Sequence, residues 1–332
     1  MRALLSHAPG KPESLTIGDL PEPIPQGAQV RIAVTACALN YPDALVVQDM
    51  YQERPPRPFA PGLEIAGIVD AAGPEAAQFM PGERVFGALK WGGLAEKALV
   101  DENKLFRVPE GMTMEEAAAL LTTYGTAHYA LDRRARLLPG ETLLVLGASG
   151  GVGLAAVELG KARGARVVAA ASSAEKAALA KRCGADEILV YPRNPLDLAQ
   201  AKALGQAIKL ATNDRVDVVF DAVGGDYAQP ALRAMSWGGR YLVIGFAAGV
   251  SSIPLNLPLL KGCDIQGVFW GSAIQRDGLL FRQTTEELLS LYRAGMIKPL
   301  VAQTVPLSEG GAALQRMAER NIVGKVVVRV DQ

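Results

Sequence analysis

The stretch Leu143–Leu154 reads LLVLGASGGVGL and decides the fold. Its first five residues form an apolar run that is typical of a strand buried on both faces. Four glycines, the first of them Gly147 at the end of this run, fall within seven positions before an apolar segment with helical character. Gly147 would let the chain turn sharply, and Gly150 and Gly151 would let backbone N–H groups approach a diphosphate. Gly153 would let the helix start close against the sheet.

A glycine pattern of this kind is a weak signal alone, but its surroundings strengthen it. A helix is predicted at Gly153–Arg163 and a second strand at Arg166–Ala171, so the glycines lie inside a βαβ unit of the expected size. We predict that a dinucleotide binds here, with its diphosphate at the positive N-terminus of the helix. A tight turn without a ligand is the alternative. The residues expected at the diphosphate are Ala148, Ser149, Gly150, Gly151, Val152 and Gly153.

The bulk composition favours small-molecule partners. The chain has 332 residues, enough for two ordinary domains. Lys plus Arg and Asp plus Glu both number 34, and no basic block marks a nucleic-acid binder. Cys37, Cys183 and Cys263 lie far apart without a CxxC pair, which fits a reducing compartment. Because we also find no signal-peptide core and no uninterrupted apolar span, we expect a soluble cytoplasmic protein.

The rhythm of predicted elements indicates two kinds of domain. Residues 1–110 contain short β-like runs between Pro and Gly clusters, which indicates an irregular barrel. A helical pattern at Thr113–Leu131, with Thr113 as N-cap, leads into alternating strands and helices that predict a doubly wound parallel sheet. Helix and strand patterns beyond Trp270 are too few to close a domain, so we expect them to return to the barrel. The six predicted strands are Leu143–Gly147, Arg166–Ala171, Glu187–Val190, Val216–Asp221, Gly239–Gly245 and Asp264–Trp270.

The residues after the second predicted strand favour a phosphorylated dinucleotide. An NAD site usually has an acidic residue about 20 positions beyond the glycines, which holds the ribose 2′-hydroxyl. Here Ser172, Ser173 and Lys176 offer two hydroxyls and one cation for a 2′-phosphate. Glu175 would repel that phosphate, but the segment 172–175 fits a capping box that turns the carboxylate back to the Ser172 backbone. We therefore predict NADPH as the cofactor, with an ordinary solvated Lys176 as the alternative.

Several segments occur in the order found in one known family. They are CALNYPDALVVQDMYQERPPRPFAPGLEIAG, TTYGTAHYAL, LGASGGVGLAA, DAVGGD, VIGFAAG, VFWG and ERNIVGKVVV. Through them the chain resembles the zinc-independent medium-chain dehydrogenases/reductases, in the quinone oxidoreductase group that includes zeta-crystallin. The resemblance implies a discontinuous GroES-like β-barrel catalytic domain and a Rossmann domain that binds NADPH. The expected boundaries are 1–121 for the first part of the catalytic domain, 122–263 for the Rossmann domain, and 264–332 for the last Rossmann strand and the return.

The resemblance also bears on metal and on substrate. The related zinc alcohol dehydrogenases have a Cys where Asn40 stands and a His where Leu63 stands, and their four-cysteine structural lobe is missing here. We therefore expect no metal, and an acceptor that is already electrophilic, such as a quinone or a conjugated carbonyl. Tyr51 matches a tyrosine that related enoyl thioester reductases place by the substrate, where it bonds the carbonyl oxygen or supplies a proton. Asn40 and Asp43 match polar residues that position the nicotinamide or the substrate. A loop aromatic and a helix cap are the alternatives for Tyr51 and Asp43.

Further cofactor contacts follow from the resemblance. Thr126 and two aromatic segments match the nicotinamide side, Tyr191 and Lys176 match holders of the 2′-phosphate, and Arg320 matches a residue near the adenine. The alternative for Phe246 and Trp270 is that they are core aromatics and do not contact the nicotinamide. The remaining expected contacts are Val223, Gly245, Phe246, Ala247, Phe269, Trp270 and Gly271.

Two histidines, His7 and His128, lack acidic or cysteine neighbours of a metal or nucleophile site in the sequence, and we interpret both as structural. The sequence thus predicts an NADPH-dependent quinone oxidoreductase. A 2-enoyl thioester or alkenal reductase is the first alternative, and a low-turnover NADPH-binding protein of crystallin or RNA-binding type is the second. Because the strand Asp264–Trp270 would lie at a sheet edge, we also expect a homodimer.

Overall fold

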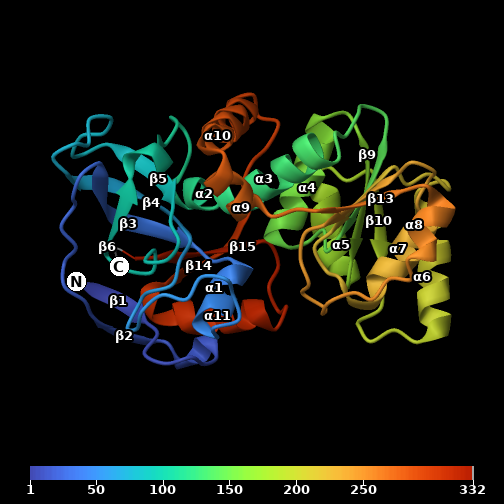
Figure 1. Ribbon diagram of the computed structural model, residues 1–332, viewed down its shortest axis with the longest axis horizontal. Helices are drawn as coiled ribbons and strands as arrows, with labels where there is room; N and C mark the ends of the chain where they lie inside the picture. Colours follow the sequence, from blue (N-terminus) through green and yellow to red (C-terminus); the bar gives the residue numbers. More distant parts are fainter. Residues whose placement is uncertain (331–332) are drawn as a thin grey trace. The chain divides into compact units, whose positions relative to one another are not determined.

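The structure, a computed structural model, describes residues 1–330 and folds as two units (Figure 1). Unit 1 consists of Met1–Thr122 and the described residues from Pro299 onward. Unit 2 is Thr123–Lys298. Unit 1 is therefore built from the two ends of the chain, with unit 2 inserted between them.

Unit 2 contains a six-stranded sheet in the order β10-β9-β8-β11-β12-β13, with every neighbouring pair parallel. The strand order reverses between β8 and β11, and ligands of such sheets bind at the carboxyl ends of the strands at that point. The doubly wound parallel sheet predicted from the sequence is confirmed. The strands are β8 (Thr142–Leu146), β9 (Arg166–Ala171), β10 (Glu187–Val190), β11 (Val218–Asp221), β12 (Arg240–Val243) and β13 (Asp264–Gly267).

Helices cover both faces of this sheet. Leu144 and Val168 pack with Leu204, Ile208 and the helix at 228–234 on one face. On the other face, a Cβ placed on Gly160 would meet the side chains of Leu143 and Val167, so the helix after the glycine turn lies there. From Gly151 onward, the helices of unit 2 are α4 (Gly151–Ala162), α5 (Ala174–Arg182), α6 (Leu198–Ala211), η4 (Gly225–Tyr227), α7 (Ala228–Ala234), α8 (Asn256–Lys261), α9 (Trp270–Arg276) and α10 (Gly278–Arg293).

Two of the predicted elements differ from the structure by more than two residues at an end. The helical pattern Thr113–Leu131 is divided into α2 (Met114–Ala118), α3 (Leu121–His128) and the π-helix η3 (Tyr129–Arg134). Thr113 caps α2 as predicted, because its Oγ1 accepts a hydrogen bond from Glu116 N at 3.1 Å. The last predicted strand of the parallel sheet is too long, since β13 ends at Gly267 and Trp270 begins α9.

Unit 1 is built on a seven-stranded sheet in the order β14-β15-β3-β4-β5-β7, with β6 paired to β3. The last strand of the chain pairs antiparallel with β3, so the expected return of the C-terminal segments to the N-terminal strands is observed. The strands are β3 (Gln29–Ala38), β4 (Glu64–Ala72), β5 (Arg84–Ala88), β6 (Lys97–Asp101), β7 (Leu105–Arg107), β14 (Val301–Pro306) and β15 (Lys325–Arg329). A separate pair is formed by β1 (Arg2–Leu5) and β2 (Thr16–Asp19), and the helices are η1 (Pro12–Ser14), α1 (Tyr41–Val47), η2 (Glu102–Lys104), η5 (Leu307–Glu309) and α11 (Gly310–Ala318).

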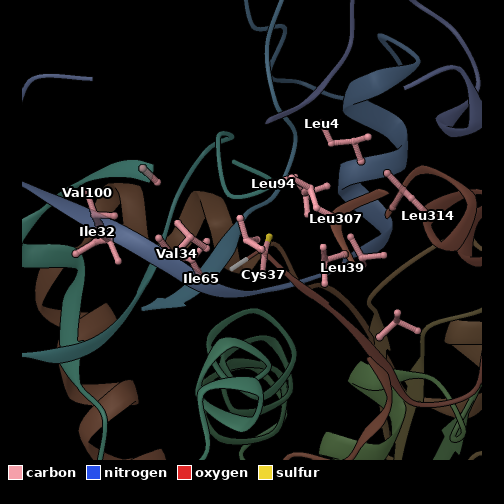
Figure 2. Packing of buried hydrophobic residues seen from close by; sticks show 14 of the residues in the cluster. Leu4, Ile32, Val34, Cys37, Leu39, Ile65, Leu94, Val100, Leu307 and Leu314 are labelled. Atoms are coloured by element: carbon pink, nitrogen blue, oxygen red, sulfur yellow. The ribbon is translucent and has the colours of Figure 1, made fainter. Parts of the chain in front are cut away.

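The core of unit 1 runs along β3. Figure 2 shows Ile32, Val34, Cys37 and Leu39 packed in one cluster with side chains from the neighbouring elements. Burial alternates along the first part of β3 and becomes continuous at its end. The chain therefore enters the turn at Asn40 from a fully buried strand, which holds that turn inside the unit. Among residues 1–330, we find no helix whose length and apolarity suffice to cross a bilayer.

Candidate functional site

The glycine turn of unit 2 has the close packing that its sequence predicts. Gly147 has a φ of 76°, which a residue with a side chain rarely adopts. A Cβ on Gly153 would lie 2.2 Å from Gly147 O and 2.8 Å from Ala148 Cα. Because backbone atoms cannot move aside, only glycine fits at 153, and α4 starts directly against the turn.

Gly150 is different, because the protein itself does not require a glycine there. Its φ is −80°, and a Cβ would meet Gly147 O only at 3.6 Å, an ordinary contact. Gly150 is the N-cap of α4, and the first turn of α4 contains no acidic residue, so the positive end of the helix dipole is not neutralised from within. The absence of a side chain at Gly150 therefore leaves space beside the helix N-terminus. A diphosphate that approaches the backbone closely would fit in that space.

A second turn, at the end of β11, lies against the glycine turn. Asp221 Oδ1 accepts hydrogen bonds from Val223 N at 2.8 Å and Gly224 N at 2.9 Å. Tyr241 donates its hydroxyl to Asp221 Oδ2 at 2.6 Å. A Cβ on Gly147 would lie 2.8 Å from Val223 Cγ2, so the two turns are in contact at the point where the strand order reverses. Burial raises the pKa of Asp221 although these three donors oppose the shift.

The end of β9 differs from the sequence prediction in one respect. The capping box predicted at residues 172–175 is wrong, because the N-cap of α5 is Ser173, whose Oγ accepts from Lys176 N at 3.2 Å. The chain stays extended through Ser173, with φ −156° and ψ 159°, so the helix starts one residue later. Glu175 is exposed in the first turn of α5, while Ser172 and Lys176 are half-buried.

Two aromatic residues expected at the cofactor are core residues in this structure. Tyr191 is 5% exposed, with its ring centroid 4.6 Å from that of Tyr227. Trp270 is 6% exposed and packs on Tyr129 at 5.8 Å and on Phe281 at 6.2 Å. A Cβ on the neighbouring helix residue Gly125 would meet the Trp270 ring at 2.6 Å. Their contacts with a cofactor stay predictions.

The other expected cofactor residues are more accessible. Phe246 and Phe269 are each 48% exposed. Thr126, one position after Gly125 on α3, is half-buried, as are Gly245, Ala247 and Gly271. Arg320 belongs to unit 1, where it is exposed after α11 with a φ of 60°. Their contacts with the nicotinamide or the adenine also stay predictions.

In unit 1, Asn40 and Asp43 hold two turns together. Asn40 is the N-cap of α1, and its backbone N–H donates to Asp43 Oδ2 at 2.7 Å. Asp43 Oδ1 accepts from Gly62 N at 3.0 Å, which joins this turn to the one before β4. Asp43 is 1% exposed, and burial raises the pKa of its carboxyl to about 7.

A buried lysine completes this arrangement. Lys325 Nζ donates to Asn40 Oδ1 at 2.8 Å and to Glu64 Oε1 at 2.7 Å. Asn40 Nδ2 donates to Glu64 Oε1 at 2.9 Å and to Ala38 O at 3.1 Å. Glu64 Oε2 accepts from Thr122 N at 2.8 Å, at the start of α3. Sequence analysis missed Lys325 and Glu64; a single lysine at the head of the apolar run KVVV is the signal that a buried partner exists.

These bonds define what the site of unit 1 can do. The polar atoms of Asn40 and both carboxylate oxygens of Asp43 already have partners inside the protein, so contact of either side chain with a substrate stays a prediction. The donor set does not fit zinc, because Leu63 offers no ligand atom and the Asn40 oxygen faces an ammonium that would repel a metal ion.

Tyr51 lies in the segment between α1 and β4 and is half-buried. Burial, and then the negative charges of Asp43 and Glu53, raise the pKa of Tyr51. Its hydroxyl therefore keeps its proton at neutral pH and can donate a hydrogen bond. The segment is anchored by Arg57, which donates from Nη2 to Asp49 Oδ1 at 2.9 Å.

His128 corrects the sequence analysis. The expectation that it lacks acidic neighbours is wrong, because its Nε2 lies 2.8 Å from both Asp132 Oδ2 and Glu287 Oε2. The Arg163 guanidinium also pairs with Asp132. His128 Nδ1 is buried without a hydrogen-bond partner among the described residues, so a metal on Nε2 would leave a buried N–H unpaired. We interpret the cluster as a structural ion network; the four-residue spacing of His128 and Asp132 was visible in the sequence.

A glycine turn at the switch point of a parallel Rossmann sheet, together with a separate β unit that holds a polar cluster, defines a dinucleotide-dependent oxidoreductase. Residues 26–110 match the family described as alcohol dehydrogenase GroES-like domain, and residues 151–292 match the family described as zinc-binding dehydrogenase. The chain belongs to the quinone oxidoreductase group of the medium-chain dehydrogenase/reductase family. Its resemblance to that family, stated from the sequence motifs, is confirmed.

Individual relatives support this assignment. The chain is 38% identical to quinone oxidoreductase-like protein 2 of Rattus norvegicus, over 95% of this chain and 89% of the relative. It is 34% identical to the quinone oxidoreductase of Thermus thermophilus, solved alone and with NADPH, with a TM-score of 0.83 over 99% of this chain and all of the other. The mycobacterial protein Rv1454c, solved with NADPH, is 28% identical with a TM-score of 0.91, over 99% of this chain and 100% of the other.

Proposed function

We propose that this protein is an NADPH-dependent quinone oxidoreductase that transfers hydride to a quinone or a related conjugated carbonyl without zinc. The observation that carries the proposal is that one chain combines a glycine turn suited to a diphosphate with a catalytic unit that lacks zinc ligands. In that unit, Asn40 and Leu63 occupy the positions where zinc alcohol dehydrogenases have a Cys and a His. An acceptor that spreads the charge of an added hydride over its own conjugated oxygen does not require a Lewis acid.

The residues of the chain would bind and orient the reactants. The N-terminus of α4 and the turn at residues 148–153 would hold the diphosphate, and Ser172, Ser173 and Lys176 would hold the 2′-phosphate. When bound, NADPH supplies the hydride. The protonated hydroxyl of Tyr51 would donate a hydrogen bond to the acceptor oxygen and stabilise the charge that develops there.

The test is a comparison of acceptors. Purified protein is mixed with NADPH and, in turn, quinones, enals and enoyl-CoA thioesters, while the absorbance of the reduced nicotinamide is followed. We expect the fastest oxidation with quinones. If an enoyl thioester is the preferred acceptor, the protein is an enoyl reductase instead. If NADPH binds but no acceptor accelerates its oxidation, the enzymatic proposal is wrong and a binding role without turnover is favoured.

A variant pair tests the role of Tyr51. Tyr51→Phe is expected to lower kcat by roughly 10²-fold, since a positioned proton donor contributes on that order. Tyr41→Phe is the control, because Tyr41 begins α1 in the same unit and is 36% exposed. Equal activity of the two variants would show that the Tyr51 hydroxyl has no part in the reaction.

We also propose that the protein forms a homodimer through β13. Within residues 1–330 this strand pairs with β12 alone, so it lies at the edge of its sheet, with Ile265 40% exposed. Beside it along the chain, α8 exposes Leu259 (75%) and Leu260 (64%). An unpaired edge next to exposed leucines is a surface that a second copy would cover.

A cytoplasmic location is also part of the proposal. It is supported by the three free thiols, and fractionation of the source cells tests it.

A further inference from the structure

The Lys325 ammonium is enclosed inside unit 1. Lys325 is 4% exposed, and its Nζ has three acceptors: Leu39 O at 3.0 Å, Asn40 Oδ1 at 2.8 Å and Glu64 Oε1 at 2.7 Å. An ammonium has three protons to donate, so its hydrogen-bonding capacity is used completely. The acceptors come from the two residues that follow β3 and from the first residue of β4, both far from Lys325 in the sequence.

These bonds fix the orientation of one amide. Because Asn40 Oδ1 accepts from the ammonium while Asn40 Nδ2 donates to Glu64 Oε1, exchanging the oxygen and nitrogen of the amide would break both bonds. Lys325, Asn40 and Glu64 thus form a closed triangle of hydrogen bonds. Glu64 extends it to Thr122 N, and the Asn40 backbone extends it to Asp43.

Stability alone does not account for this triangle. Replacing a buried ion pair by groups of similar volume without charge is often neutral or stabilising, because both ions lose their hydration on burial. The triangle does, however, hold the two turns, at 40–43 and 62–64, that border the segment carrying Tyr51. Asp43 accepts from Asn40 N and Gly62 N, which stand at the two ends of the segment that carries Tyr51, so a shift of either turn moves the ends of that segment.

We propose that Lys325 is a positioning residue of the proposed reaction: its ammonium fixes the Asn40 amide and, through Glu64, the two turns beside Tyr51. This inference rests on the proposed function. In this reading the site is assembled around an internal ammonium, in a unit whose zinc-dependent relatives hold a metal at the position of Asn40.

The test separates the charge from the fold. Lys325→Met leaves a buried carboxylate without its partner and is expected to be unstable. The double variant Lys325→Met/Glu64→Gln removes both charges at nearly constant volume and should fold. We expect it to lower kcat/KM for the quinone by about 30-fold or more, while the Kd for NADPH changes by less than about 2-fold. Lys97→Met is the matched control, because Lys97 lies on β6 of the same sheet and pairs with Glu22 at the surface. It should change neither value.

Lys325→Arg adds a second comparison, since it keeps the charge but cannot reproduce the three bonds of an ammonium. If the double variant retains kcat/KM within about 3-fold of the unmodified protein, the ion pair is only structural and the proposal is wrong. Failure of the proposed function is recognised separately, because the unmodified protein would then reduce no quinone. In that case hydrogen exchange decides. The amides of Asn40 and Gly62 donate to Asp43, which the double variant leaves unchanged, and they should exchange about 10-fold faster in that variant. Unchanged exchange of both amides would refute the positioning role.

Discussion

Tyr241 donates its hydroxyl to Asp221 Oδ2 at 2.6 Å, and both residues are almost completely buried in unit 2. Burial raises the pKa of both groups, and the negative charge of Asp221 raises that of Tyr241 further. Asp221 also accepts a hydrogen bond from Val223 N, and the Val223 side chain contacts the glycine turn at Gly147. A buried hydroxyl thus supports the carboxylate that shapes the predicted cofactor site.

Tyr241→Phe is therefore expected to destabilise the protein. The change leaves a buried carboxyl oxygen without its donor, which costs about 1.5–3 kcal/mol for a bond to a charged group. The free energy of unfolding from urea titration measures the effect. Tyr129→Phe is the control, because it keeps the ring that packs on Trp270. Equal stability of the two variants would contradict the role assigned to the Asp221 bond.

The raised pKa of Asp43 predicts a pH dependence of stability. The pKa rises from 3.8 to about 7 on folding, so the folded state binds the proton more tightly than the unfolded chain does. The contribution of Asp43 to stability is therefore greatest at low pH and is lost as the pH rises from about 4 to about 7. The stability of the unmodified protein relative to Asp43→Asn should fall by roughly 2–3 kcal/mol between pH 5 and pH 8.

Urea titrations of both proteins across that range measure the difference. Asp43→Asn also loses one of the two acceptors for backbone N–H groups, but that loss does not depend on pH. Asp49→Asn, in the segment after α1, is the control: it loses its ion pair with Arg57, and its difference from the unmodified protein should be the same at pH 5 and at pH 8. A constant difference between the unmodified protein and Asp43→Asn would contradict the raised pKa.

Two glycines of the same turn should respond differently to alanine. Gly153→Ala would place a methyl group 2.2 Å from Gly147 O and should destabilise the protein by about 2 kcal/mol or more. Gly150→Ala meets only an atom at 3.6 Å and should leave stability within about 0.5 kcal/mol. Because a diphosphate would need the space that this methyl fills, Gly150→Ala should still weaken NADPH binding about 10-fold or more, measured by nicotinamide fluorescence. Unchanged affinity would place the diphosphate elsewhere.

Lys176 tests which dinucleotide the protein prefers. If its ammonium faces a 2′-phosphate, Lys176→Ala should weaken NADPH binding about 10-fold and leave NADH binding unchanged, since NADH lacks that phosphate. Lys181→Ala, near the other end of the same helix, is the control. A parallel loss of affinity for both nucleotides would show that Lys176 does not recognise the phosphate.

The parts that the sequence predicted well depend on local patterns. The strand of the LLVLG run and the glycine turn follow from an apolar run and from glycines that only one geometry accommodates. The return of KVVV to the first sheet was predicted because the elements beyond Trp270 are too few to close a domain. Polar contacts between distant segments were not predictable in this way. Lys325 and Glu64 are 261 residues apart, and His128 and Glu287 are 159 residues apart, so neither pair leaves a local pattern. The cap of α5 was misplaced by one residue because Ser172 and Ser173 are equally good caps by sequence.

The two edges of the parallel sheet allow a direct test of the proposed dimer. Ile265 on β13 and Ile188 on β10 are each 40% exposed, but only β13 is preceded by the exposed leucines of α8. Ile265→Lys should place a charge in the proposed interface and convert a dimer into a monomer, measured as molar mass by light scattering at micromolar concentration. Ile188→Lys adds the same charge at the opposite edge and should leave the mass unchanged. If the unmodified protein is already monomeric, or if both variants keep the dimer mass, β13 is not the contact between copies.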